Sequence, residues 1–267
     1  MSNNPPEQKK AITRPPYSEL AQIYDGITQS TSNEFWQQHI RDTLIRHHIK
    51  VFPKMTKILE LACGTGASML PWLRQGFSVD GVEISPQMLE KAKHKLKNYN
   101  VDLRCMNMLE IDYEDEYDLV LCLYDTVNYL QTDEELELLF AKVYKALHEN
   151  GVFWFDINTP YFLRHYNWLE LRERFDSLLH SWTCGYDIID NVAWCKLVME
   201  RDGELYEEIH REKVHNIYNV LAILERAGFE VIATKNSFAD SKMRQNSKKV
   251  DIIVQKRTTG KQGKLNI

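Results

Sequence analysis

The chain has 267 residues, of which 43% are hydrophobic, and its formal net charge at pH 7 is −5. This composition excludes a disordered chain and is enough for one large domain, or for one domain with an insertion. The negative charge gives no basic field for a polyphosphate backbone, so we expect no nucleic acid partner. The sequence shows neither a signal-peptide pattern nor an apolar run of about 20 residues, so we expect a cytoplasmic protein without a membrane partner.

The N-terminal part of the chain combines a polar stretch with a helical pattern. Residues 1–16 are rich in Pro, Asn and Lys, and we expect them to be disordered. Over residues 17–49 the apolar side chains recur at helical spacing, which predicts two amphipathic helices that cap the core. The pair His47-His48 has no evident third ligand, and cationic residues are common at a helix C-terminus, so no metal site is predicted.

From residue 50 to residue 160, short apolar runs alternate with helical patterns. The expected strands are residues 57–61, 77–83, 101–106, 117–124 and 151–157. Ser85-Pro86 is a helix-start signal, and Gly151 is the expected C-terminal cap of a helix over residues 133–150. Strands that alternate with helices predict an open parallel sheet with right-handed crossovers.

After residue 160 the pattern changes to β-favouring runs of alternating character. Three such runs are separated by Asp190-Asn191 and Asp202-Gly203, which are typical hairpin turns. Residues 161–215 are therefore predicted to form a small antiparallel insertion. Residues 216–257 return to the core with one helix and a pair of strands, and residues 258–267 are expected to be disordered.

Five cysteines stand at positions 63, 105, 122, 184 and 195, and they form neither a CxxC pair nor a zinc spacing. The first three lie in apolar, strand-like runs, where a cysteine behaves as a small buried hydrophobic residue. This usage predicts reduced cysteines, as in a cytoplasmic protein.

A glycine-rich motif follows the first expected strand. ELACGTG spans residues 60–66, and Gly64 and Gly66 permit backbone conformations that other residues avoid. Glu83 ends the second expected strand, where its carboxylate can accept hydrogen bonds from both ribose hydroxyls of a nucleoside. Together, the two features predict a nucleoside site at the carboxyl edge of the sheet.

Two kinds of nucleoside cofactor can be compared with this motif. The dinucleotide fingerprint Gly-x-Gly-x-x-Gly is incomplete, because Ala67 in one frame and Met69 in the other replace its third glycine. Glu60 also places an anion in the crevice, where it would repel a pyrophosphate but could bind an ammonium group. The motif favours a sulfonium nucleoside; an NAD(P)-dependent oxidoreductase and a non-catalytic protein that binds the sulfonium cofactor are the alternatives.

Four motifs, ELACGTG, VEISPQML, LCLYDTVNYL and FDINTPY, resemble those of the class I S-adenosylmethionine-dependent methyltransferases. The resemblance is to the small-molecule branch with a β insertion after the fifth strand, and it covers about residues 17–256. It implies a doubly wound α/β fold with seven mostly parallel strands and an antiparallel last strand. It also implies S-adenosyl-L-methionine as cofactor, S-adenosyl-L-homocysteine as product, and in-line transfer of the methyl group to N or O of a small molecule.

The resemblance further implies which residues bind the cofactor. The methionine part would be held by Glu60, Ala62, Gly64, Gly66 and Leu123. The ribose would be held by Glu83, and the adenine by Ile84, Met88, Asn107 and Met108. Tyr24 resembles an N-terminal tyrosine that closes over the cofactor in related enzymes; an aromatic residue in the core is the alternative.

Residues that could contact the methyl acceptor follow the fourth and fifth strands or lie at the end of the insertion. They are Tyr124, Asp125, Asn128, Tyr129, Asn158, Tyr161, His210 and His215. Asp125, Tyr129 and His210 are predicted to be catalytic, although Asp125 could instead cap a helix and each histidine could be a packing residue. The aromatic residues of the insertion are expected either to cover the acceptor or to form a homodimer contact; they are Trp182, Tyr186, Trp194 and Tyr206.

Overall fold

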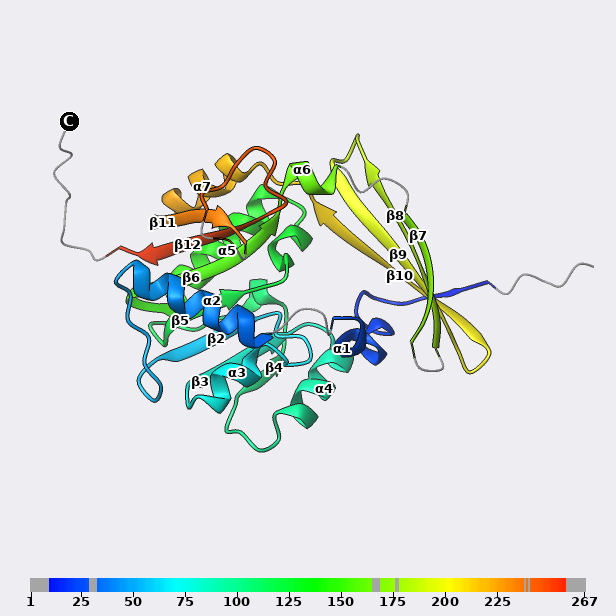
Figure 1. The fold of residues 1–267 in the computed structure, drawn as a ribbon, viewed down its shortest axis with the longest axis horizontal. Helices are drawn as coiled ribbons and strands as arrows, with labels where there is room; N and C mark the ends of the chain where they lie inside the picture. The colour runs from blue at the N-terminus through cyan, green and yellow to red at the C-terminus, as the bar shows by residue number, and fades with distance from the viewer. Residues whose placement is uncertain are drawn as a thin grey trace, which may run out of the picture.

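The computed structural model describes residues 10–28, 33–164, 169–175, 178–237, 239 and 241–257. Within these ranges the chain forms two sheets, which we call the core sheet and the insertion sheet (Figure 1). The core sheet contains β2 (Lys57–Leu61), β3 (Ser78–Glu83), β4 (Leu103–Cys105), β5 (Tyr117–Cys122), β6 (Leu147–Asn158), β11 (Phe229–Asn236) and β12 (Lys249–Lys256). The insertion sheet contains β1 (Ile12–Thr13), β7 (Leu169–Phe175), β8 (Leu178–Asp187), β9 (Val192–Arg201) and β10 (Glu204–Lys213).

The strand order of the core sheet is β11-β12-β6-β5-β2-β3-β4. β12 runs antiparallel to β6 and β11, and the other neighbouring strands are parallel. This arrangement confirms the predicted sheet of seven mostly parallel strands with an antiparallel last strand. The near-continuous apolar runs of the central strands follow from burial of both faces.

Helices cover both faces of the core sheet (Figure 1). They are α2 (Asn33–Arg46), α3 (Met69–Arg74), α4 (Pro86–Lys95), α5 (Asp133–Ala146) and α7 (Ile217–Arg226), with the short helices α1 (Tyr24–Ile27) and α6 (Pro160–Leu163) and the 3-10 turns η1 (Leu20–Gln22), η2 (Met108–Glu110) and η3 (Thr126–Tyr129). Along β2 the side chains alternate, so that Ile58 packs toward α2 and α3 whereas Leu59 packs toward α5 and α7. None of the described helices is long and apolar enough to cross a membrane.

The predicted end of α5 is wrong. The helix begins at a capping box formed by Thr132 and Glu135, but it ends at Ala146 rather than at Gly151. Leu147 is fully buried and already pairs with Tyr117 as the first residue of β6. Burial of Leu147 in the sheet therefore overrides the helical pattern of the residues that follow.

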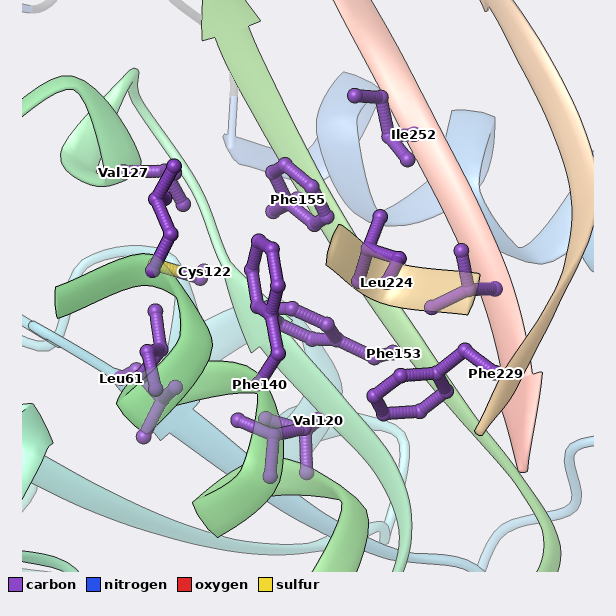
Figure 2. Packing of buried hydrophobic residues seen from close by; sticks show 14 of the residues in the cluster. Leu61, Val120, Cys122, Val127, Phe140, Phe153, Phe155, Leu224, Phe229 and Ile252 are labelled. Atoms are coloured by element: carbon purple, nitrogen blue, oxygen red, sulfur yellow. The ribbon is translucent and has the colours of Figure 1, made fainter. Parts of the chain in front are cut away.

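A cluster of phenylalanines fills the core between the sheet and α5 (Figure 2). Phe140 of α5 lies 6.1 Å from Phe153 and 5.7 Å from Phe155, measured between ring centroids. All three side chains are fully buried. These rings hold α5 against β6. The carboxyl end of β6 borders the space beyond the edge of the sheet.

Replacing Phe140 with Ala is expected to lower the free energy of unfolding by about 3–5 kcal/mol, because it removes a buried ring and leaves a cavity. Chemical denaturation followed by circular dichroism measures this change. Leu138→Ala, on the exposed side of the same helix, is the matched control. A loss as small as that of the control would show that Phe140 does not organise this core.

The N-terminal part of the chain differs from the prediction. Residues 10–16 were expected to be disordered, but Ile12–Thr13 forms β1 parallel to β10, and the Arg14 amide donates to the Glu207 carbonyl at 2.8 Å. The first expected helix is two short turns, η1 and α1. Residues 1–9 and 258–267, also expected to be disordered, lie outside the described residues.

The insertion sheet has the order β1-β10-β9-β8-β7, and its four long strands are joined by antiparallel pairings. The β8–β9 and β9–β10 turns lie at the predicted hairpin positions, where Asn191, Asp202 and Gly203 have positive φ angles. In Figure 1 this sheet stands beside the core sheet, and η1 and α1 lie between the two. The insertion contributes β7, β8, β9 and β10, one strand more than the three expected. β1, from the N-terminal part of the chain, is the edge strand beside β10.

The expectation that all cysteines are reduced is wrong for one pair. Cys184 on β8 and Cys195 on β9 stand directly opposite each other and form a disulfide, with their Cα atoms 4.1 Å apart. Cys63 and Cys122 are free and buried, as predicted, whereas Cys105 is exposed because β4 is an edge strand. The register of β8 and β9 places the two cysteines opposite each other, and the spacing of cysteines in the sequence does not reveal this register.

Candidate functional site

A cavity of about 900 Å³ lies beyond the carboxyl ends of β2, β3, β4 and β5. β2 occupies the middle of the core sheet between β3 and β5, so the chain changes direction across the sheet at this strand. Ligands in open α/β folds bind at such a switch point. Residues 14–28, which we call the N-terminal segment, line the cavity from the opposite side.

The glycine-rich loop after β2 forms one wall of this cavity. Ala62 and Gly64 line it, and both have positive φ angles, 51° and 56°. At Gly66, a Cβ would come within 2.8 Å of the Leu96 side chain. Gly66 therefore allows close packing of the loop against the end of α4, and it is not among the cavity-lining residues.

Glu83 lies at the end of β3 and is only 5% exposed. Its two carboxylate oxygens accept hydrogen bonds from the backbone amides of Gly64 at 2.9 Å and Ser85 at 2.8 Å. Burial raises the pKa of the Glu83 carboxyl, and these amides offset part of the rise. Because each carboxylate oxygen has two lone pairs, both can accept a further hydrogen bond from a ligand in the cavity.

Glu60 lies at the end of β2 and lines the same cavity. One of its oxygens accepts a hydrogen bond from the Ser68 hydroxyl. The other oxygen is buried and has no hydrogen-bond partner within the described part of the chain. Burial raises the pKa of Glu60 to about 7. An unsatisfied buried carboxylate oxygen of this kind is suited to an ammonium group supplied by a ligand.

The other predicted cofactor residues lie around the same space. Those that line the cavity are Tyr24, Ile84, Met88, Asn107, Met108 and Leu123. The Asn107 side-chain oxygen accepts a hydrogen bond from the Leu109 amide at 3.0 Å and thereby caps η2. Apart from Gly66, the structure thus brings the whole predicted cofactor set to one cavity.

Comparison with known proteins identifies this arrangement. Residues 58–151 match a family described as "Methyltransferase domain". A provisionally named methyltransferase of Geobacillus sp. (strain WCH70) is 25% identical, and the match covers 90% of this chain and 99% of the relative. A crystal structure of an S-adenosylmethionine-dependent methyltransferase from Clostridium acetobutylicum superposes with a TM-score of 0.78 at 22% identity, covering 90% of this chain and 98% of that one. Residues 58–151 thus belong to a methyltransferase family, and the relatives that match most of the chain support a class I S-adenosylmethionine-dependent methyltransferase.

S-adenosylmethionine is the cofactor of this methyltransferase, which replaces the two alternatives weighed from the sequence. An amino pentose methyltransferase from Micromonospora echinaspora, solved with S-adenosylmethionine bound, has a TM-score of 0.69 at 19% identity, covering 88% of this chain and 97% of that one. The cavity fits such a cofactor. It offers the unsatisfied Glu60 oxygen, the partly satisfied Glu83 carboxylate, and an open loop at Gly64.

The far half of the methyltransferase cavity is lined by tyrosines. Tyr17 and Tyr129 share a hydrogen bond of 2.8 Å between their hydroxyls, and Tyr129 shares a second, of 3.0 Å, with Nδ1 of His210. His210 Nε2 lies 3.3 Å from a carboxylate oxygen of Glu208. Burial raises the pKa of both tyrosines well above the usual value, so their hydroxyls are neutral. We call Tyr17, Tyr129 and His210 the Tyr–His chain.

Two of the three predicted catalytic residues therefore meet. Tyr129 lines the cavity, whereas His210 lies behind it and is 5% exposed. Glu208, which the sequence analysis missed, fixes this arrangement, since its carboxylate also accepts hydrogen bonds from the backbone amides of Tyr17, Glu19 and Leu20. It thereby ties the N-terminal segment to β10. In the sequence, Glu208 is one of several polar residues of an alternating strand pattern, and this pattern does not indicate its role.

Asp125 has a different environment from either one expected. It stands in the left-handed region at the start of η3 with no capping hydrogen bond from its side chain. Its carboxylate is paired with the Lys249 ammonium, which also lies 2.9 Å from Asp156. Lys249 was missed because it belongs to the last strand, 124 positions away. Asp125 is thus held in an ion pair within the protein and does not line the cavity.

The remaining acceptor candidates divide into cavity and packing residues. Tyr124 lines the cavity, and burial raises its pKa. Asn128 is fully buried and binds backbone groups of Asn158 and Lys213, so it joins β6 to the end of β10. His215 is buried against the Leu130 carbonyl at 2.9 Å.

Two further candidates do not line the cavity either. Asn158 donates to Glu212 at 2.9 Å, and Tyr161 is 41% exposed. Among the insertion aromatics, Trp182 lies 5.9 Å from His210 between ring centroids and packs against Leu20 and Ile23, so it supports the N-terminal segment.

Proposed function

We propose that this methyltransferase methylates an amine nitrogen of a small molecule and that the Tyr–His chain accepts the proton the amine loses. The observation that carries the proposal is the hydrogen bonding of Tyr129, a cavity-lining residue, to His210. A weak base of this kind suits an amine, which needs only a proton acceptor before or after transfer, better than it suits a hydroxyl. The amino pentose substrate class in the name of one structural neighbour agrees with this choice.

We further propose the cofactor contacts that the family resemblance implies. Glu83 accepts hydrogen bonds from the ribose hydroxyls, and Glu60 pairs with the amino group of the methionine part. Backbone groups at Ala62 and Gly64 hold the rest of the methionine part, beside Leu123. The adenine lies among Ile84, Met88, Asn107 and Met108. When bound, S-adenosylmethionine supplies an electrophilic methyl group on a sulfonium.

The residues of the chain then act by positioning and by proton transfer. Tyr17, Tyr24, Tyr124 and Tyr129 enclose the space between the two sheets, where they exclude water and present aromatic surface to a cation. Holding the nucleophile in line can account for about 7–11 kcal/mol of the barrier. Tyr129 touches the acceptor: its oxygen takes up the proton of the amine while its own hydroxyl proton passes to Nδ1 of His210, whose Nε2 lies beside Glu208.

A screen for release of S-adenosylhomocysteine tests the proposed function. The purified protein is incubated with S-adenosylmethionine and a panel of small amines, each paired with the alcohol of the same skeleton. We expect product from one class of amines and none from the matching alcohols. Methylation of the alcohols alone would contradict the amine assignment, and binding of NAD in place of S-adenosylhomocysteine would contradict the cofactor contacts.

The raised pKa of Glu60 predicts a pH-dependent affinity. Only the ionised carboxylate pairs with an ammonium, and with a pKa of about 7 its ionised fraction rises about tenfold between about pH 6 and about pH 8. We therefore expect calorimetry to show S-adenosylhomocysteine binding about tenfold more tightly at the higher pH. Glu60→Gln should bind more weakly and show no such dependence, whereas the exposed control Glu230→Gln should behave as the wild type.

The same substitution separates binding from folding. The pKa of Glu60 in the folded protein is raised from 4.5 to about 7, so the stability of the unliganded fold falls as the pH rises between these two values, and the full penalty remains above about pH 7. Glu60→Gln should therefore raise the free energy of unfolding at pH 8 by up to about 3 kcal/mol while it weakens the cofactor affinity. A variant that lost both stability and affinity would show a structural role only.

A further inference from the structure

We infer that the methyl acceptor carries an anionic group, a carboxylate or a phosphate, that Arg14 and Arg201 bind at the far end of the cavity. This inference rests on the proposed function and narrows its substrate class. Among the described residues that line the cavity, these two arginines are the only basic side chains. The acidic side chains that line the cavity are Glu19, Glu60, Glu83 and Glu135.

Distant parts of the chain bring the two arginines together. Arg14 directly follows β1, and its backbone amide is bonded to β10, whereas Arg201 ends β9. Glu19, only 6% exposed, lies between them: its oxygens are 3.9 Å from Arg14 Nε and 2.5 Å from Arg201 Nη1. The Tyr206 ring supports both guanidinium groups, whose central carbons lie 5.5 Å and 4.8 Å from its centroid.

The charges of Arg14, Arg201 and Glu19 do not balance one another. Glu19 supplies one negative charge for two guanidinium groups, so one positive charge is in excess. Asp202 approaches Arg201 at 3.8 Å, but its side chain is 91% exposed and solvent screens it. The nearby Lys196 and Glu207 pair with each other at 2.8 Å. The side chains of Arg14 and Arg201 are 46% and 33% exposed, so their remaining N–H groups are accessible.

The chemistry of guanidinium groups indicates the ligand. Two oriented guanidinium groups present several N–H donors in a plane, a geometry that matches carboxylate and phosphate oxygens. The N-terminal segment connects this group to the reacting end of the cavity, because Arg14 is joined by two prolines to Tyr17, which is bonded to Tyr129. Proline fixes the backbone between them. An acceptor with its anion at the arginines would therefore present its amine at Tyr129.

The methionine carboxylate of the cofactor is the competing ligand for these arginines. The proposed contacts place that part of the cofactor at Glu60 and Gly64, on the wall formed by the end of β2. If the arginines held the cofactor instead, their removal would weaken binding of S-adenosylhomocysteine. The two ligands are therefore distinguished by measuring the affinity for each one separately.

Calorimetry on the complex with S-adenosylhomocysteine tests the inference without a known acceptor. Inorganic phosphate and acetate are titrated into this complex of the wild type, Arg14→Gln, the double variant R14Q/R201Q and Arg211→Gln. Arg211 is exposed on β10 and does not line the cavity, so it is the matched control. We expect anion affinity to fall about tenfold in Arg14→Gln and further in the double variant, with no change in the control.

The relative affinities for phosphate and acetate also indicate which anionic group the acceptor carries. Preference for phosphate indicates a phosphorylated acceptor, and preference for acetate indicates an amino acid or related carboxylate. Equal anion binding in all variants, no binding to the wild type, or loss of S-adenosylhomocysteine binding in the double variant would each overturn the inference. Because Arg201 still pairs with Glu19 in Arg14→Gln, this single variant keeps the test valid if the double variant is unstable.

Matched acceptors extend the test to catalysis. O-phosphoethanolamine is compared with ethanolamine, and β-alanine with its amide. We expect the wild type to have a kcat/KM at least about tenfold higher for one anionic member than for its neutral partner, and R14Q/R201Q to lose this ratio. If no amine is methylated but anion binding still depends on the arginines, then the proposed function fails while the anion site stands. Equal kcat/KM for the anionic and neutral members would contradict an anionic acceptor.

Discussion

Glu83→Ala is expected to weaken binding of S-adenosylhomocysteine about 10²- to 10³-fold, as measured by calorimetry. The carboxylate can accept a charge-assisted hydrogen bond from each ribose hydroxyl, and each such bond contributes about 1.5–3 kcal/mol. Glu83 is 5% exposed at the cavity wall, so water replaces these bonds poorly. The substitution also removes the acceptor for the Gly64 amide, which loosens the loop beside the ligand.

Two further variants make this result specific. Glu83→Gln keeps an oxygen that can accept from the Gly64 amide but loses the charge, so it should bind more weakly than the wild type and more tightly than Glu83→Ala. Glu230→Ala, exposed on β11, should leave the affinity unchanged. An affinity of Glu83→Ala equal to that of the wild type, with the fold verified by circular dichroism, would remove Glu83 from the cofactor site.

Tyr129→Phe is expected to lower kcat about 10²-fold while S-adenosylhomocysteine binds as in the wild type. The change keeps the ring but removes the hydroxyl that joins the cavity to His210. Because the pKa of Tyr129 is raised well above its usual value, this hydroxyl is a neutral relay rather than a phenolate base. Steady-state kinetics on an amine from the screen measures the effect, and KM should change less than kcat.

A double-mutant cycle tests whether Tyr129 and His210 act as one unit. If Tyr129 passes the proton to His210, then His210→Gln alone and Y129F/H210Q should both lower kcat about as much as Tyr129→Phe. Tyr218→Phe, 73% exposed on α7, is the control for loss of a tyrosine hydroxyl. Additive losses in the double variant would show that the two residues affect the reaction independently, which contradicts the proton path.

The N-terminal segment makes the active site depend on both sheets. Its backbone is bound by Glu208 of the insertion sheet, and its carbonyl at Tyr17 accepts a hydrogen bond from Ser85 of the core at 2.9 Å. At α1, Asp25 accepts from Thr65 and pairs with Lys95 at 2.8 Å. The segment therefore closes the cavity by contacts to the cofactor loop and to the acceptor side together.

The sequence by itself determined the order of strands and helices along the chain and the set of residues that line the proposed cofactor wall, and the family resemblance implied the antiparallel last strand. These features depend on local signals: alternation of apolar runs, the glycine-rich loop after β2 and an acidic residue at the end of β3. In a parallel sheet the carboxyl ends of neighbouring strands meet at one edge, so residues such as Glu60 and Glu83 are brought together by topology alone. The loop pattern does not show that Gly66 packs against the end of α4.

Only the tertiary structure brought together the residues of the proposed acceptor side. Tyr17, Tyr129 and His210 meet although 112 positions separate the first two and 81 the last two. The ion pair of Asp125 with Lys249 and the disulfide between Cys184 and Cys195 likewise require strand pairings and register. These contacts depend on how the insertion sheet and the N-terminal segment pack beside the core, and a local pattern of residue types carries no information about such long-range packing.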